Sequence, residues 1–174
     1  MLRTTFGLTL MVALTGCATP EPKEPPLVGT VSIASGPCLG LCPVFTMEVN
    51  TEDRYLLDSG ANTINEGNSR GGLPVGSFRR ALGLLDRYEF NAKQRSYTPG
   101  NSVTCPDRVT GTPTLTIIRE AGDFRKVVTY DVGCLGFAEK DSLDRLVEGL
   151  YRTFRISDLV AVGEPPKAED QQGQ

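Results

Sequence analysis

The sequence predicts an α+β fold, a two-layer sandwich in which helices cover one face of an antiparallel sheet. Two groups of short segments alternate apolar with polar residues, which is the period of a strand with one buried face. Each group is followed by one segment whose apolar residues recur at helical spacing. Hairpins followed by a helix favour an antiparallel sheet with the helices on one side. The expected order of elements is β-β-β-α-β-β-α.

The first group contains three strands. A strand is expected over residues 27–34, where Val31 and Ile33 face the same way. In residues 44–49 every second residue is apolar, and the pattern resumes at residues 54–57 after a short turn. Because the break between them is so short, these two segments are expected to form a hairpin.

Two predicted loops flank the first helix. Residues 59–76 are rich in Gly and Asn, and this composition predicts a loop. Residues 91–112 form a polar segment so long that it must either carry a function or be tied down. Between them a helix is expected over residues 77–88, with Ser77 placed to cap its first turn. Its apolar face contains Phe78, Ala81, Leu82, Leu85 and Tyr88.

The second group is one hairpin followed by the clearest helix. Residues 114–119 and 126–130 are rich in β-branched side chains and are separated by a turn at residues 121–123. The last helix is expected to begin at Asp141 or Ser142, either of which can serve as its cap. Its apolar face contains Leu143, Leu146, Val147, Leu150 and Phe154.

Length and charge limit the classes of protein to consider. The chain has 174 residues, of which 39% are hydrophobic and 22% charged, as is typical of one globular domain. A net charge of −3 and the lack of a Lys/Arg cluster argue against a nucleic-acid partner, which would need a basic surface. We expect a signal peptide at residues 1–16, a lipidated Cys and Pro-rich linker at 17–26, one domain at 27–162 and a disordered tail at 163–174.

The N-terminus has the architecture of an export signal. An apolar stretch at residues 6–14, too short to span a membrane, is followed by small residues and Cys17. Residues 14–17, Leu-Thr-Gly-Cys, resemble a bacterial lipobox. This resemblance implies transfer of a diacylglycerol with palmitate-type chains to the Cys17 sulfur, cleavage before Cys17 and acylation of the new N-terminus. We expect a lipoprotein anchored in the cell envelope, and Ala18 favours the outer membrane, facing the periplasm.

Four further cysteines, Cys38, Cys42, Cys105 and Cys134, are expected to form disulfides. An even number of cysteines in an exported chain indicates disulfides, because the compartment is oxidising. Pairing each cysteine with its nearer neighbour would close loops of about 5 and 30 residues and contribute about 2 and 3.6 kcal/mol. The two crossed pairings remain open, since all four cysteines could meet at one end of the sheet.

A thiol site for metal or redox chemistry at Cys38 and Cys42 is an alternative. The Cys-x3-Cys-Pro spacing resembles that of Sco-type copper chaperones, which use a distant histidine as a further ligand. This chain has no histidine, and Cys42 precedes a strand rather than a helix whose N-terminus could lower the pKa of a thiol. The spacing of Cys105 and Cys134 also does not suit a four-cysteine zinc site. We therefore expect neither a metal nor another cofactor.

The cysteine motif carries a family resemblance. Residues 40–45, Gly-Leu-Cys-Pro-Val-Phe, follow Cys38, and a second segment, Cys-Pro-Asp, stands at residues 105–107. Together with the order of hairpins and helices, these motifs resemble the domain of unknown function 6438 over about residues 28–156. The family is found in bacterial proteins, many of them lipoproteins. This chain departs from the pattern in having no Gly in the turn after the motif and in carrying Phe45 in place of Tyr.

One stretch suggests an enzyme. Residues 56–61, Leu-Leu-Asp-Ser-Gly-Ala, resemble the active-site turn of retropepsin-like aspartic proteases, which would make Asp58 the catalytic acid. The helix predicted at residues 77–88 does not suit that all-β fold, and Asp-Ser-Gly is also an ordinary turn. We expect no catalytic residue and interpret Asp107 and Asp131 as solvated acids.

The function predicted from the sequence is therefore that of a structural or binding module in the cell envelope. Its partners are expected to be the membrane, through the lipid anchor, and an envelope protein. The predicted loops at residues 59–76 and 91–112 are the segments most available for binding, because loops carry function more often than the elements that they join.

Overall fold

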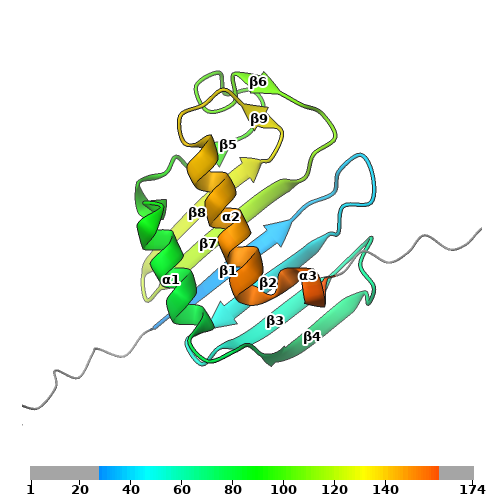
Figure 1. Cartoon of the computed structure of the whole chain (residues 1–174), viewed down its shortest axis with the longest axis vertical. Coiled ribbons are helices and arrows are strands. Elements are labelled where there is room, and N and C mark those ends of the chain that lie inside the picture. Colours follow the sequence, from blue (N-terminus) through cyan, green and yellow to red (C-terminus); the bar gives the residue numbers. More distant parts are fainter. Residues whose placement is uncertain (1–27, 161–174) are drawn as a thin grey trace, which may run out of the picture.

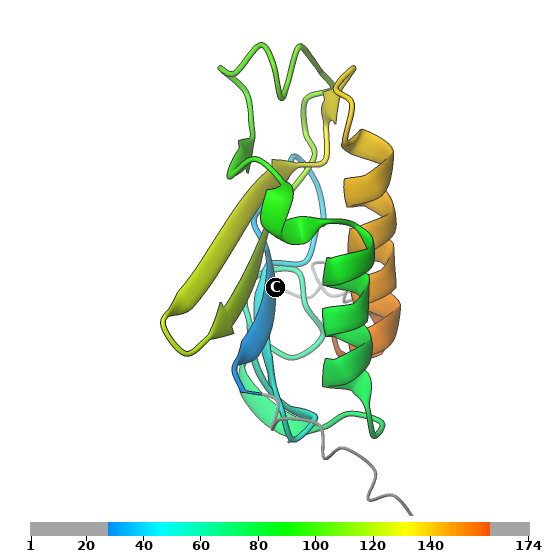
Figure 2. The ribbon, with the colours of Figure 1, turned by 90° about the vertical axis from the view of Figure 1, so that its left-hand side faces the viewer.

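A computed structural model describes residues 28–160, which form a sheet covered on one face by two helices (Figures 1 and 2). The predicted α+β sandwich is confirmed. None of the helices in this part of the chain is both long and apolar enough to cross a membrane. The strands are β1 (Thr30–Ser35), β2 (Phe45–Asn50), β3 (Arg54–Ser59), β4 (Gly67–Gly72), β5 (Ser96–Tyr97), β6 (Asp107–Arg108), β7 (Thr114–Ala121), β8 (Phe124–Asp131) and β9 (Cys134–Leu135), and the helices are α1 (Ser77–Arg87), α2 (Lys140–Phe154), α3 (Ile156–Leu159) and the 3₁₀ turn η1 (Phe90–Ala92).

The main sheet has seven strands in the order β4-β3-β2-β1-β7-β8-β5. Adjacent strands of this sheet are antiparallel, except that β5 pairs in parallel with β8. β1 therefore lies in the middle and joins the two hairpin groups, by pairing with β2 on one side and β7 on the other. β6 and β9 form a separate two-stranded ladder at one end of the sheet (Figure 1).

The core lies between the sheet and the pair α1 and α2. The strand residues predicted to face inward are buried, among them Val31, Ile33 and Met47. The two apolar helix faces also lie in this core; Phe78, Ala81, Leu85, Leu143, Leu146, Leu150 and Phe154 are buried, and Leu82, Tyr88 and Val147 are partly buried. Figure 2 shows both helices on the same side of the sheet, so the opposite face has no helical cover.

The start of α1 is held by an acid from a distant turn, and the prediction that Ser77 caps the helix is wrong. The Asp53 carboxylate, in the turn between β2 and β3, accepts bonds from the N–H groups of Gly76 and Phe78 at 2.7 Å each. The Ser77 hydroxyl instead donates to the Pro74 carbonyl at 2.6 Å. Asp53 satisfies two of the free N–H groups that every helix start leaves without an intrahelical partner.

The predicted cap of the last helix is wrong as well. α2 begins at Lys140 after Glu139, and no side chain caps it. Asp141 and Ser142 lie inside its first turn rather than before it. Asp141 still has a favourable place, since a negative charge in the first turn complements the helix dipole.

Both predicted loops contain short strands. Residues 67–72, within the loop expected at residues 59–76, form the edge strand β4, which pairs with β3 over its whole length. Three of its six residues are Gly, so the segment shows no alternation of apolar and polar side chains from which a strand could be predicted. Backbone hydrogen bonds to β3 hold it in an extended conformation instead. The segment 91–112 contains β5 and β6, which tie it to β8 and β9.

Candidate functional site

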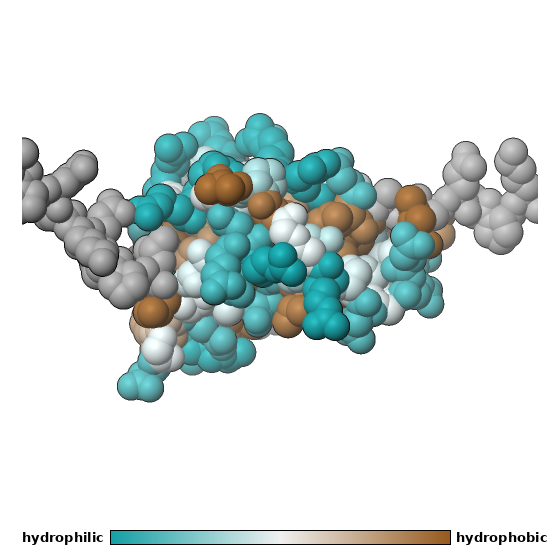
Figure 3. Space-filling model, turned by 90° about the horizontal axis from the view of Figure 1, so that it is seen from below, coloured by the Kyte–Doolittle hydropathy of each residue, from teal (hydrophilic) through white to brown (hydrophobic). Residues whose placement is uncertain are grey.

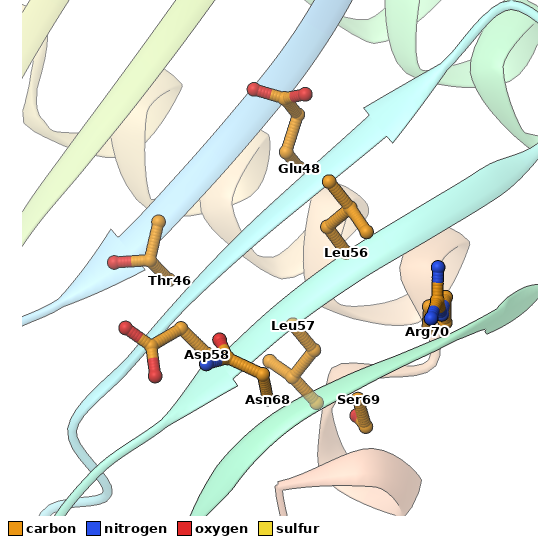
Figure 4. A pocket seen from close by; sticks show the side chains of 8 residues that line it. All are labelled: Thr46, Glu48, Leu56, Leu57, Asp58, Asn68, Ser69 and Arg70. Atoms are coloured by element: carbon orange, nitrogen blue, oxygen red, sulfur yellow. The ribbon is translucent and has the colours of Figure 1, made fainter.

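The face of the sheet opposite the helices carries a groove of about 440 Å³ over β2, β3 and β4. Its residues come from three adjacent strands, and Leu56 at its centre leaves 59% of its surface exposed. In Figure 4 the helices lie behind the sheet, while side chains such as Glu48 and Asp58 stand in front of it. The groove is lined by Thr46, Glu48, Leu56, Leu57, Asp58, Asn68, Ser69 and Arg70.

Opposite charges surround the exposed leucine. In the strand register Glu48 stands opposite Leu56 on one side and Arg70 stands opposite it on the other. Along β3 itself, Arg54 and Asp58 are the next residues on the same face, two positions before and after Leu56. The groove therefore offers an apolar centre with two carboxylates and one guanidinium group around it, and Arg54 adds a second guanidinium group on the same face just outside it. This arrangement suits a ligand with both apolar and charged groups.

The free edge of β4 borders this groove. Two hydrogen bonds show which residues of β3 and β4 face each other with their backbone groups. The Leu73 N–H donates to the Asp53 carbonyl at 2.8 Å, next to the ladder between β3 and β4, and the Gly60 N–H donates to the Val44 carbonyl at 2.8 Å, next to the ladder between β2 and β3. Because bonded and non-bonded pairs alternate along an antiparallel ladder, residues 67, 69 and 71 bond to β3. The N–H and C=O groups of Asn68, Arg70 and Gly72 consequently point outward. An unpaired row of backbone groups is a template for another extended chain.

The four cysteines form two disulfides at one end of the sheet. Cys38 is bonded to Cys42, and Cys105 to Cys134, so the structure selects the local pairing from the three that the sequence left open. The first bridge is partly exposed and closes a tight loop whose Leu39 is 84% exposed. The second is buried, with exposed fractions of 8% for Cys105 and 0% for Cys134.

An aromatic cluster packs beside the second bridge. The Cys134 sulfur lies 3.4 Å from the Tyr97 carbonyl oxygen, and the Tyr97 ring lies 5.0 Å from that of Phe137. Tyr130 is 6.1 Å from Phe137 and donates its hydroxyl hydrogen to the Asp144 carboxylate at 2.6 Å. Burial, followed by this bond to Asp144, raises the pKa of Tyr130 above its usual range.

Asp131 is a structural acid, and its interpretation as a solvated residue is wrong. Only 1% of Asp131 is exposed, and its carboxylate accepts bonds from the Thr112 hydroxyl at 2.8 Å and the Gly133 N–H at 2.9 Å. The Arg108 guanidinium completes the set at 3.1 Å. Asp131 thereby fastens the end of the segment 91–112 to β8. Asp107, in contrast, is exposed as expected.

The structure places the other predicted site residues as follows. Asp58 lies in β3, exposed in the groove, with Thr46 and Asn68 directly opposite it rather than another carboxylate. In the part of the chain that the structure describes, no three His, Cys, Asp or Glu side chains gather as a metal site would require. Cys17, the predicted lipid attachment site, lies outside the described residues.

Sequence reasoning did not single out Glu48, Leu56 and Arg70 as site residues. The alternation in β2 and β3 does predict that Glu48 and Leu56 point away from the core. Nothing in the sequence places Arg70 beside them, because β4 was not predicted. The surface at the end of the molecule where α1 begins was the other place to look for a site. Apolar side chains there are scattered among hydrophilic ones and form no continuous patch (Figure 3). We therefore place the candidate site in the groove over β2, β3 and β4.

Comparison with models of protein families assigns most of the folded chain to one family. A family model described as Domain of unknown function (DUF6438) matches residues 29–151, which is more than half of the chain. The matched range runs from the start of the sheet into α2, and so includes both disulfides and the groove. The curated proteins that were searched contain no match.

Proposed function

The chain belongs to this family of domains of unknown function, DUF6438, and on that premise we propose that it is a lipid-anchored envelope protein whose sheet binds an extended segment of a partner protein. The free edge of β4 beside the groove carries this proposal. A partner strand added at that edge would bond to the backbone of β4, and its side chains would reach over the groove. The partner we propose is a protein of the same compartment, and binding needs no catalysis by this chain.

The lipid anchor is the first part of the proposal, and the lipobox at residues 14–17 supports it. Acylated Cys17 would hold the domain on the outer membrane, facing the periplasm, because two or three acyl chains anchor a protein stably. Replacing Cys17 with Ser tests this part. We expect Cys17→Ser to move the protein from the membrane to the soluble fraction and to remove the mass of the acyl groups from the mature chain.

The mode of binding is the second part, and the free backbone groups of β4 support it. Main-chain bonds at an exposed sheet edge supply affinity that does not depend on the partner's sequence. The charged residues around Leu56 would add selectivity, since a bound strand must offer charges that complement Glu48, Asp58 and Arg70. An apolar side chain of the partner would cover Leu56.

The edge can be blocked without breaking the sheet. Arg70 directs its N–H outward, so Arg70→Pro removes an outward donor while the ladder between β3 and β4 keeps its bonds. Arg70→Ala is the matched control, because it removes the same side chain and keeps the N–H. In intact cells, with a photoreactive side chain at residue 68, we expect one envelope protein to crosslink in wild type and in Arg70→Ala but not in Arg70→Pro.

Equal crosslinking by the two variants would overturn binding through the edge. Thermal unfolding of Arg70→Pro within a few degrees of wild type would show that the strand itself remains. The protease alternative predicts a different result, namely peptide cleavage at acidic pH that disappears in Asp58→Asn. Cleavage of that kind by the purified protein would replace the binding proposal with an enzymatic one.

A further inference from the structure

A second groove lies on the helical side of the molecule, between α1 and α2. Its volume is about 380 Å³, within the range of small-ligand sites. Three arginines lie around it, Arg80 and Arg87 from α1 and Arg152 from α2. Its floor is formed by Gly83, Leu84 and Gly149.

The two glycines give the groove its depth. Gly149 is buried where the helices touch, and a Cβ there would lie 3.0 Å from the Leu84 side chain, so the close approach of the helices favours glycine. Gly83 is different, because it is exposed and a Cβ there would meet no atom within 4 Å. A glycine in a helix interior costs up to about 1 kcal/mol relative to Ala. Close packing therefore does not explain why a glycine stands at position 83, whereas the need to keep the floor of the groove open does.

The arginines are arranged around Gly83. Arg80 and Arg87 lie nearly one turn before and slightly more than one turn after it, on the same side of α1. The Arg80 guanidinium is oriented by bonds to the Val75 carbonyl at 3.1 Å and the Ser77 hydroxyl at 2.9 Å. These contacts direct Arg80 without neutralising it, because neither acceptor is charged.

Acidic side chains near the groove compensate only part of this charge. Glu148 lies 3.6 Å from Arg152, and both side chains are largely exposed, so the pair is weak. Asp86, beside Arg87 in α1, is paired with Arg119 at 2.9 Å instead. Three guanidinium groups and one carboxylate leave the groove with a formal charge of two positive units.

We propose that this groove binds a phosphomonoester group, with Arg80, Arg87 and Arg152 as its ligands. The charge of the groove matches that of a phosphomonoester near neutral pH, and guanidinium groups bind phosphate oxygens through paired hydrogen bonds. Leu84 and the open surface over Gly83 would contact the carbon part of the same ligand. The site is on the opposite side of the molecule from the sheet groove and does not depend on the proposed function.

Calorimetric titration of the purified full-length mature protein with inorganic phosphate tests the proposal. We expect binding that weakens about tenfold or more in Arg87→Gln, as the loss of one charged hydrogen-bonding group predicts. Arg145→Gln is the matched control, because Arg145 is an exposed arginine of α2 outside the groove, and it should change the affinity less than about twofold. Equal weakening in both variants, or no binding, overturns the proposal.

Filling the floor separates binding from folding. Gly83→Leu places a side chain over the groove and replaces glycine with a better helix former, so we expect unchanged or higher thermal stability together with loss of phosphate binding. A Gly83→Leu variant that is stable and binds like wild type would show that the ligand does not use this groove.

Vesicles distinguish the sources of the phosphate group. Binding to phosphatidylcholine vesicles with phosphatidate, a lipid phosphomonoester, but not to those with phosphatidylglycerol, a diester, would assign the site to a lipid headgroup. Binding to inorganic phosphate alone would assign it to a soluble phosphate ester. If an oligoglutamate peptide binds with the same dependence on Arg87 and phosphate does not, the groove is a protein-binding surface and the proposal is wrong.

Discussion

The two ends of the sheet are closed by different means. At one end, the Cys38–Cys42 bridge closes the loop that follows β1, and the buried bridge Cys105–Cys134 joins the segment before β6 to β9 across 29 positions of sequence. At the other end, Asp53 joins the turn between β2 and β3 to the start of α1 through two hydrogen bonds. The first end contains long segments with few apolar residues, whereas the second is already held by short turns. Covalent braces occur where the chain has the most conformational freedom to lose.

The largest effect is expected from removing the buried bridge. Replacing Cys105 and Cys134 with Ala frees a loop of about 30 residues, and we expect the free energy of unfolding to fall by about 3.6 kcal/mol. Urea unfolding of the double variant against wild type measures this change. A loss no greater than that caused by removing the other bridge would contradict the comparison of loop lengths.

Removing Cys38–Cys42 should cost less. The loop that it closes has about five residues, so Cys38→Ser with Cys42→Ser is expected to lower the free energy of unfolding by about 2 kcal/mol.

Burial also predicts the order in which the two disulfides are reduced. With increasing dithiothreitol, alkylation followed by peptide mapping should label Cys38 and Cys42 before Cys105 and Cys134, because only the first bridge is accessible. Simultaneous labelling would mean that the domain unfolds before either bridge is reduced.

The opposite end is tested through Asp53. Asp53→Ala leaves the N–H groups of Gly76 and Phe78 without their acceptor, and we expect a loss of about 1 to 2 kcal/mol, typical of a helix cap. Asp53→Asn keeps one acceptor oxygen and should lose less. Urea unfolding of both variants measures the difference. Equal losses would indicate that the conformation of the turn, where Asp53 has φ of 57°, matters more than the cap.

The smallest effect is expected from the aromatic cluster and appears only at alkaline pH. The pKa of Tyr130 is raised in the native state, so native Tyr130 keeps its proton at pH values where the unfolded chain loses it, above about pH 10. The native state then binds more protons, and its stability falls as pH rises. Between pH 10 and 11 the difference in unfolding free energy between wild type and Tyr130→Phe should shrink by about 1 kcal/mol, because half of the unfolded chains have already lost this proton at pH 10. A difference that is independent of pH would contradict the raised pKa.

Elements whose signal is local can be predicted from the amino-acid order without knowledge of the fold. The alternation in residues 44–49 and the helical spacing in residues 143–154 persist in any context, since they reflect the geometry of a strand and of a helix. The count of four cysteines in the domain likewise predicted disulfides. Local patterns of this kind predict the fold class and the face that each element buries.

Features that depend on a distant partner become visible once the chain is folded. β4 is a strand because β3 offers it a ladder, Asp53 is a cap because α1 begins beside it, and Asp131 is buried because Arg108 and Thr112 fold over it. The pairing of the cysteines and the two grooves belong to the same class. Residues far apart in the chain meet at each of these places, and the energy that holds them together has no counterpart in the local sequence pattern.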